Sequence, residues 1–194
     1  MEVKVIQETS WKRALNAARR TMGKEPLDKE PSEKFKVKSM MSEHSQIKLV
    51  EYLISFRALR QWVGVHILRH GFMLPFIHSQ RGDRRQLPCK RDDLPQGTEN
   101  DQDFIMNAQT LINVSRRRLC NTASKETVEA WKAVRDEIES QDPIVARFMV
   151  PNCVYRGFCP EDPERCCGFV KTKKFKEWRD RYTDGFCKYE GELI

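Results

Sequence analysis

Polar and apolar positions alternate in two segments near the start of the chain, and a period of two residues is typical of a strand with one buried face. The first segment, residues 3–6, predicts a short opening strand. The second lies within residues 47–56, where the alternating apolar side chains are Val50, Tyr52, Ile54 and Phe56. We therefore expect two strands in the first third of the chain.

In four further segments the apolar residues recur every three or four positions, which indicates helices with one buried face. These segments are residues 11–22, capped by Thr9 or Ser10, and residues 57–70, 104–118 and 126–138. Residues 23–38 and 82–103 are rich in charge and proline, so we expect exposed connections there. The second connection is expected to lie over or beside a functional site.

Composition narrows the class of protein. A length of 194 residues favours a single domain over residues 1–194, and the 32% of charged residues are typical of a soluble globular chain. The net charge of +7 favours anionic partners such as nucleotides, nucleic acid or phosphorylated cofactors. The sequence contains no run of apolar residues long enough for a membrane helix and no secretory signal, so we expect a cytoplasmic protein.

The C-terminal tail, residues 151–194, is rich in cysteine. The chain has seven cysteines, an odd number that suits a reduced protein better than a disulfide scaffold. One alternative is a zinc site made by the tail thiolates Cys153, Cys159, Cys166 and Cys167. Their spacing lacks the paired C-x2-C of structural zinc sites, and unpaired thiols are an equally good interpretation, so we predict no metal.

A group of cationic and hydroxyl side chains could hold a phosphate. Arg69 and His70 end the second predicted helix, and Ser79 and Arg81 follow about ten residues later. Arginine donates paired hydrogen bonds to a phosphate, and serine adds another. His66 and His70 lie four residues apart and would share a helix face, but the residue after His66 is Ile67 rather than the glutamate of a zinc protease.

These segments, in this order, resemble the flavin-dependent thymidylate synthase family, whose signature is R-H-R-x-x-S-x-N-E-x-S-x-R-Y. In the same frame this chain keeps Arg69 and His70 at the start and Ser79 and Arg81 near the end. Upstream, His44 stands at the spacing of the family's flavin-contacting histidine.

Downstream segments extend the resemblance over most of residues 1–167. Residues 107–113 resemble the family's N-A-R-S-L-x-N helix, and Arg118 falls where that helix presents its nucleotide-binding arginine. Residues 123–126 take the place of the family's A-Q-W-E, and residues 84–88 resemble its R-x-x-L-P.

The resemblance implies an α+β fold in which a twisted, mostly antiparallel sheet packs against helices. It also implies a homotetramer whose active sites are shared between subunits. Members of the family use flavin adenine dinucleotide (FAD), reduced by NADPH, to transfer a one-carbon unit from methylenetetrahydrofolate to C5 of the pyrimidine nucleotide dUMP.

Carried over position by position, the resemblance implies two sets of contacts. The flavin would be contacted by His44, Arg69, His70, Asn107 and Asn113. The nucleotide would be held by His66, Ser79, Arg81, Arg84 and Arg118, among which Arg118 and Ser79 are the catalytic candidates.

This chain also departs from the family pattern. The third signature position is Gly71 instead of arginine, the Asn-Glu pair is Phe76-Ile77, the final tyrosine is Gly82, and the arginine of the N-A-R helix is Gln109. An apolar wall in place of a carboxylate should prefer a differently substituted base or cofactor.

Three functions remain open on the sequence. The first is a divergent flavin-dependent transferase of methyl or hydroxymethyl groups to a pyrimidine nucleotide. The second is a nucleotide-binding module of the same fold that has lost flavin chemistry. The third is a nucleic-acid-binding protein whose cationic surface would be formed by Arg81, Arg84, Arg85 and Arg116 to Arg118.

Overall fold

The computed structural model describes residues 1–84, 86 and 89–186. Its centre is a sheet with the strand order β1-β2-β4-β3, in which every pair of neighbours is antiparallel. The strands are β1 (Glu2–Gln7), β2 (Glu51–Arg60), β3 (Met73–Ile77) and β4 (Glu99–Asn107). The expected α+β fold with an antiparallel sheet is confirmed.

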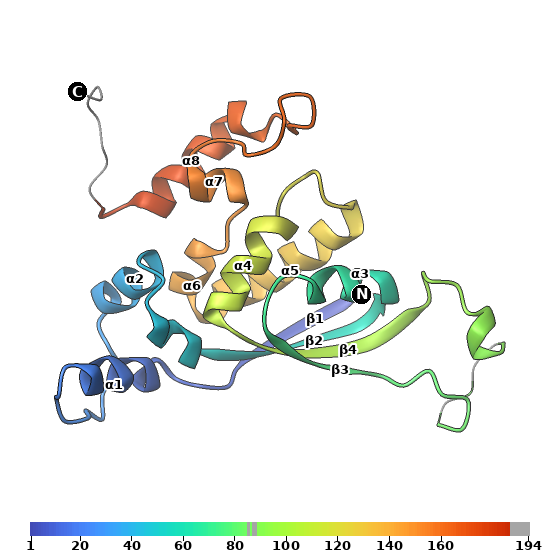
Figure 1. Ribbon diagram of the computed structural model, residues 1–194, viewed down its shortest axis with the longest axis horizontal. Coiled ribbons are helices and arrows are strands. Elements are labelled where there is room, and N and C mark those ends of the chain that lie inside the picture. The colour runs from blue at the N-terminus through green and yellow to red at the C-terminus, as the bar shows by residue number, and fades with distance from the viewer. Residues whose placement is uncertain (85, 87–88, 187–194) are drawn as a thin grey trace.

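Helices cover one face of this sheet (Figure 1). They are α3 (Gln61–Leu68), α4 (Ala108–Arg118), α5 (Lys125–Gln141) and α6 (Pro143–Phe148). At one end of the sheet lie α1 (Trp11–Thr21), α2 (Glu33–Met41) and the 3-10 helix η1 (Ser45–Leu49). A short 3-10 helix, η2 (Arg91–Asp93), lies in the connection between β3 and β4.

The C-terminal tail adds α7 (Asn152–Arg156), the 3-10 helix η3 (Phe169–Lys171) and α8 (Lys173–Thr183), which lie beyond α4 and α6 (Figure 1). Val154 and Tyr182 from this tail belong to the same buried cluster as the sheet residues. None of the helices among the described residues is long and apolar enough to cross a membrane.

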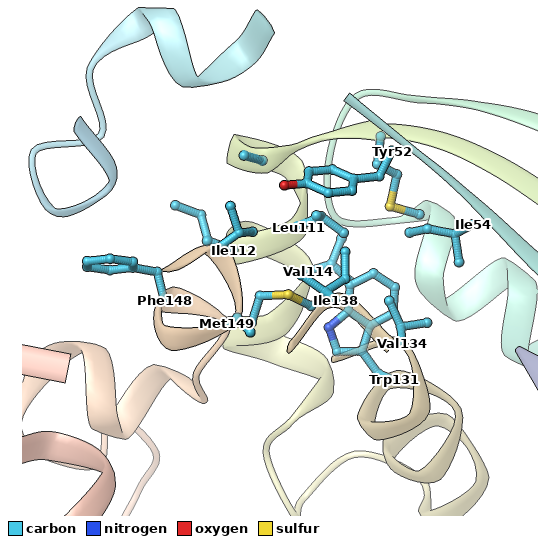
Figure 2. Close-up of a cluster of buried hydrophobic side chains, with 14 of the residues drawn as sticks. Tyr52, Ile54, Leu111, Ile112, Val114, Trp131, Val134, Ile138, Phe148 and Met149 are labelled. Carbon is cyan, nitrogen blue, oxygen red and sulfur yellow. The ribbon is translucent and has the colours of Figure 1, made fainter. Parts of the chain in front are cut away.

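The core fills the space between the sheet and α4 to α6 (Figure 2). From β2, Tyr52, Ile54 and Phe56 point into it, as the two-residue alternation predicts, and all three are fully buried. The helices contribute the buried side chains Leu111, Ile112, Val114, Trp131, Val134, Ile138, Phe148 and Met149.

A buried carboxylate ties this core to α1. Asp142 Oδ2 accepts hydrogen bonds from Trp11 Nε1 at 2.6 Å and from the Tyr52 hydroxyl at 3.0 Å. Its other oxygen accepts from the backbone N–H of Val145 at 3.1 Å and so caps α6. Burial, together with the charge of Asp142, raises the pKa of Tyr52.

Strand β2 contains a bulge shortly before it gives way to α3. The pairing with β4 shifts between Phe56 and Leu59, and Ala58 has a left-handed backbone with φ of 54°. The Ala58 N–H donates to Asp101 Oδ1 at 3.0 Å instead of to a strand carbonyl. Both Phe56 and Leu59 are buried, so the bulge changes the spacing of core residues from two to three.

The predicted strand at residues 3–6 and the predicted helices at 11–22 and 126–138 are confirmed in position. Five boundaries are wrong. The predicted strand 47–56 starts at residue 51, after η1, and residues 57–60 continue β2 instead of starting the next helix. The predicted connection 23–38 gives way to α2 at residue 33, where Ser32 caps the helix by accepting from Phe35 N at 3.3 Å.

The other two wrong boundaries surround β4. Residues 99–103, predicted to belong to an exposed connection, form its first half, and residues 104–107, predicted to begin a helix, form its second half. Helix α4 starts only at Ala108, since Asn107 Oδ1 accepts from Thr110 N at 2.9 Å and caps it.

Candidate functional site

A cavity of about 290 Å³ lies where the end of α3, the end of α4 and the tail segment after α7 meet. We call it the arginine cavity, because Arg69, Arg116, Arg117 and Arg118 line it together with His70. The tail contributes Glu161 and several thiols to the lining. Four guanidinium groups around one cavity attract an anion.

Arg118 and His70 are in direct contact within this cavity. The Arg118 guanidinium donates to Nε2 of His70. Burial, and then the charges of Arg118, Arg117 and Arg69, lower the pKa of His70 to about 4. Since arginine has no acceptor, Nε2 is the unprotonated nitrogen and the ring is neutral with its proton on Nδ1.

Arg118 keeps unused hydrogen-bonding capacity. Its Nε is buried and, within the part of the chain that the structure describes, has no hydrogen-bond partner. Burial, together with Arg69 and Arg117, lowers the pKa of Arg118. A buried donor on a cation among other cations is satisfied by an anionic oxygen.

The three consecutive arginines of α4 have different environments. Arg116 binds the Glu43 carboxylate and stacks its guanidinium 3.7 Å above the Tyr155 ring. Arg117 is exposed, and Arg118 faces His70. The three arginines therefore differ in role: Arg116 forms an ion pair within the fold, Arg117 is an exposed charge, and Arg118 has a buried donor.

Glu43 is the centre of a polar network that the sequence analysis missed. Besides Arg116, it accepts from Gln109 Nε2 at 2.7 Å. Asn113 Oδ1 accepts from Gln109 Nε2 and from Arg116 NH1, both at 3.3 Å. Gln109, which stands where the family pattern has arginine, thus holds the α4 network to the segment before His44. Glu43 precedes the predicted site residue His44 in sequence, and this neighbourhood is the feature by which the sequence could have indicated it.

The presence of glycine at position 71 has a steric explanation in this chain. A Cβ at Gly71 would lie 2.8 Å from Cγ2 of Thr110, closer than two carbons approach without a shift. The Thr110 hydroxyl donates to the Phe72 carbonyl at 2.8 Å, which holds the start of β3 against α4. The family pattern has serine, which lacks that methyl group, at the position of Thr110. The loss of the signature arginine and the presence of threonine therefore fit one another.

The remaining predicted site residues lie outside the arginine cavity. Ser79 and Arg81 belong to the connection after β3, which projects away from the helices (Figure 1), and Arg81 forms a two-point ion pair with Asp83 at 3.0 and 2.7 Å. Arg84 is exposed in the same connection. Leu87 and Pro88 of the predicted R-x-x-L-P motif, and Arg85, fall outside the described residues.

Three further predicted residues also have other surroundings. His44 is exposed at the start of η1, and Asn107 serves as the cap of α4. His66 Nδ1 lies 3.4 Å from Thr127 Oγ1, and burial followed by Arg118 and Arg69 lowers its pKa. Within one chain the structure thus brings together Arg69, His70 and Arg118 of the predicted set.

Thiols of the tail also line the arginine cavity. Cys153 is buried, which raises its pKa to about 11, while Cys159 and Cys166 are partly exposed. Among the described residues no group of three or more histidine, cysteine, aspartate or glutamate side chains is arranged to hold a metal ion. Cys187 falls outside the described residues.

No protein-family model matches the chain. One curated protein, the flavin-dependent thymidylate synthase of Clostridium tetani (strain Massachusetts / E88), is 28% identical over 98 residues, which are 50% of this chain and 39% of that protein. The chain thus matches well under half the length of that curated relative.

Solved structures share the fold. Thymidylate synthase X (ThyX) from Helicobacter pylori, solved with FAD and dUMP, gives a TM-score of 0.64 at 17% identity and covers 77% of this chain and 99% of that one. The UMP/dUMP methylase PolB from Streptomyces cacaoi, bound with 5-Br dUMP, gives a TM-score of 0.61 at 14% identity and covers 81% and 95%.

Proposed function

We propose that this chain, a divergent member of the flavin-dependent thymidylate synthase-like family, transfers a one-carbon group to C5 of a pyrimidine nucleotide. The substrate is dUMP or a related nucleotide, the product carries a methyl or hydroxymethyl group, and methylenetetrahydrofolate is the donor. The curated relative is a flavin-dependent thymidylate synthase, and two of the structural neighbours are bound to dUMP or its bromo derivative.

The observation that carries the proposal is the buried Nε of Arg118, which has no hydrogen-bond partner among the described residues, in a cavity lined by three further arginines. This donor set fits a phosphate group, which accepts several charge-assisted hydrogen bonds at once. The neutral His70 adds no competing positive charge and offers its Nδ1 proton as a further donor.

The same chemistry fits the diphosphate of FAD. Arg69 and His70, at the end of α3, would hold the flavin cofactor, and Arg118, at the end of α4, would hold the nucleotide phosphate. Bound there and reduced by NADPH, FAD would supply the reducing equivalents of the transfer. The protein supplies anchoring charges and a neutral imidazole in a partly buried site.

Ser79 and Arg81 would complete the site from a neighbouring subunit. Within one chain they lie on the projecting connection after β3, away from the arginine cavity. A homotetramer with shared sites would place this connection at the cavity of another copy, where Arg81 would exchange Asp83 for the nucleotide phosphate. The remaining flavin candidates His44, Asn107 and Asn113 would join the cofactor side of such a composite site. We expect the assembled enzyme to act in the cytoplasm.

The altered signature predicts a change in substrate preference. Phe76 and Ile77 replace the family's Asn-Glu pair and are exposed by 58% and 37%. Placed against a pyrimidine, these apolar side chains would favour a base or cofactor with an apolar substituent at that position.

The test is an absorbance spectrum of the purified protein after incubation with excess FAD and desalting. Retained flavin absorbance, followed by reoxidation of the reduced flavin on adding methylenetetrahydrofolate with dUMP, UMP or dCMP, supports the transferase. A protein that binds these nucleotides and never retains flavin is the binding module instead. Affinity for single-stranded DNA that persists in excess nucleotide and falls steeply with salt would indicate the nucleic-acid-binding function.

A further inference from the structure

The tail segment after α7 brings two cysteines, Cys159 and Cys166, into the lining of the arginine cavity. Helix α7 ends at Gly157, whose left-handed backbone (φ of 84°) turns the chain towards Cys159. The Asp162 carbonyl then accepts from Arg165 N at 2.9 Å and from Cys166 N at 3.0 Å, so the chain reverses direction. As a result Cys159 and Cys166 lie close enough to affect one another, and both line the arginine cavity.

The two thiols have different chemical characters. The Gly168 N–H donates to Cys166 Sγ at 3.4 Å and, with the thiol of Cys159 and the charge of Lys171, lowers the pKa of Cys166. The pKa of Cys159 is raised. A hydrogen bond with the Glu161 backbone lowers this pKa, but burial and the neighbouring Cys166 raise it by more. Cys166 is thus the more acidic thiol of the pair and the better source of the attacking thiolate.

We propose that Cys159 and Cys166 are a redox-active dithiol, which a low-molecular-weight disulfide converts into an intramolecular disulfide at the wall of the arginine cavity. The proposal stands on the chain reversal at Asp162, which puts both free thiols in the lining of one cavity, and on their partial exposure. It does not depend on the proposed transferase activity.

The reaction balances in two exchange steps. The Cys166 thiolate attacks one sulfur of the disulfide RSSR, which forms a mixed disulfide and releases RS⁻. The Cys159 thiol gives its proton to that thiolate and attacks Cys166 Sγ, which releases the second RS⁻; this picks up a proton from water. Two protein thiols are oxidised and one RSSR is reduced to two RSH.

The other thiols near the cavity are placed differently. Cys153 is buried with a raised pKa, and Cys120 Sγ lies 3.1 Å from Thr122 Oγ1.

Glu161 lies between the proposed pair in sequence and lines the same cavity as Arg118. A disulfide from 159 to 166 would therefore fix the segment that carries a carboxylate to the cationic site.

The experiment treats the reduced full chain with oxidised glutathione and maps the products by mass spectrometry after trypsin digestion. Trypsin separates Cys159, in peptide 157–165, from Cys166 and Cys167, in peptide 166–171. The proposal expects these two peptides to be joined, both in the wild type and in the matched control Cys167→Ser.

Two further variants identify the attacking thiol. In Cys159→Ser we expect one glutathione to accumulate on Cys166, because the second exchange step is lost. In Cys166→Ser we expect neither the link nor a mixed disulfide on Cys159. A wild type without the link, a link that is lost in Cys167→Ser, or a mixed disulfide that forms on Cys159 in Cys166→Ser would each overturn the proposal.

Discussion

Arg118 donates from its guanidinium to Nε2 of His70, and this contact connects the last residue of α4 to the turn that follows α3. Sequence places the two residues 48 positions apart. Both residues line the arginine cavity. Arg118 supplies a buried Nε with no partner in the part of the chain that the structure describes, and His70 supplies a neutral ring.

The first prediction concerns the protonation of His70. Its pKa of about 4 lies below the ordinary 6.5, because burial and the surrounding arginines disfavour the imidazolium. The contribution of the neutral ring to stability is therefore present above pH 6.5 and is lost as the pH falls from 6.5 towards 4. Nitrogen chemical shifts of the His70 ring, followed through a pH titration, measure its pKa. Bound inorganic phosphate should move the midpoint upwards, because it adds negative charge beside the ring.

The second prediction concerns Arg118→Ala. Loss of a charge-assisted contact to phosphate costs about 1.5–3 kcal/mol, so dUMP affinity should fall by about 10- to 100-fold in isothermal titration calorimetry. The matched control is Arg20→Ala, on the exposed side of α1, which should bind dUMP as the wild type does. If Arg118→Ala and Ser79→Ala both left the affinity unchanged, the assignment of these residues to the nucleotide would be wrong.

The third prediction tests the steric match between Gly71 and Thr110. In Gly71→Ala the new Cβ meets Thr110 Cγ2, and crowding of this kind costs about 1–3 kcal/mol of unfolding free energy. Thr110→Ser removes the methyl group and keeps the hydroxyl that binds the Phe72 carbonyl. The double variant should therefore recover most of the loss in urea denaturation. Equal destabilisation of Gly71→Ala with either residue at 110 would contradict the match.

The fourth prediction concerns Asp142. Asp142→Ala leaves the Trp11 indole N–H and the Tyr52 hydroxyl without an acceptor in the core and removes the cap of α6. These losses should lower the unfolding free energy by about 2–5 kcal/mol. The control Asp28→Ala removes an exposed carboxylate whose partner is Lys12, and its thermal midpoint should stay close to that of the wild type.

The sequence predicted the elements whose buried face is apolar throughout. Tyr52, Ile54 and Phe56 alternate in β2, and Trp131, Val134 and Ile138 repeat on α5, so both patterns stand out. Strand β4 alternates in the same way, but its first inward residues are Asn100 and Gln102. Polar side chains on a buried face hide the pattern, and half of this strand was taken for a connection.

Strand β3 was not predicted from the sequence, for a different reason. It is an edge strand that contains Pro75, and its side chains are exposed except for Met73. Proline is tolerated at a sheet edge, and an exposed strand shows no alternation. Among the predicted site residues, Arg69, His70 and Arg118 line one cavity, and their functional role stays a prediction. Glu43 and Thr110 depend on tertiary contacts that only the folded chain reveals.

The bulge in β2 has a consequence for the position of the cavity. Uninterrupted alternation after Phe56 would turn Ala58 and Arg60 inwards and Leu59 outwards. The left-handed Ala58 reverses this order, so Leu59 enters the core and Arg60 meets Glu126 of α5 at 3.1 Å. Helix α3 follows this bulge on the face of the sheet that α4 and α5 also cover (Figure 1). The turn after α3 then brings His70 to Arg118 at the end of α4.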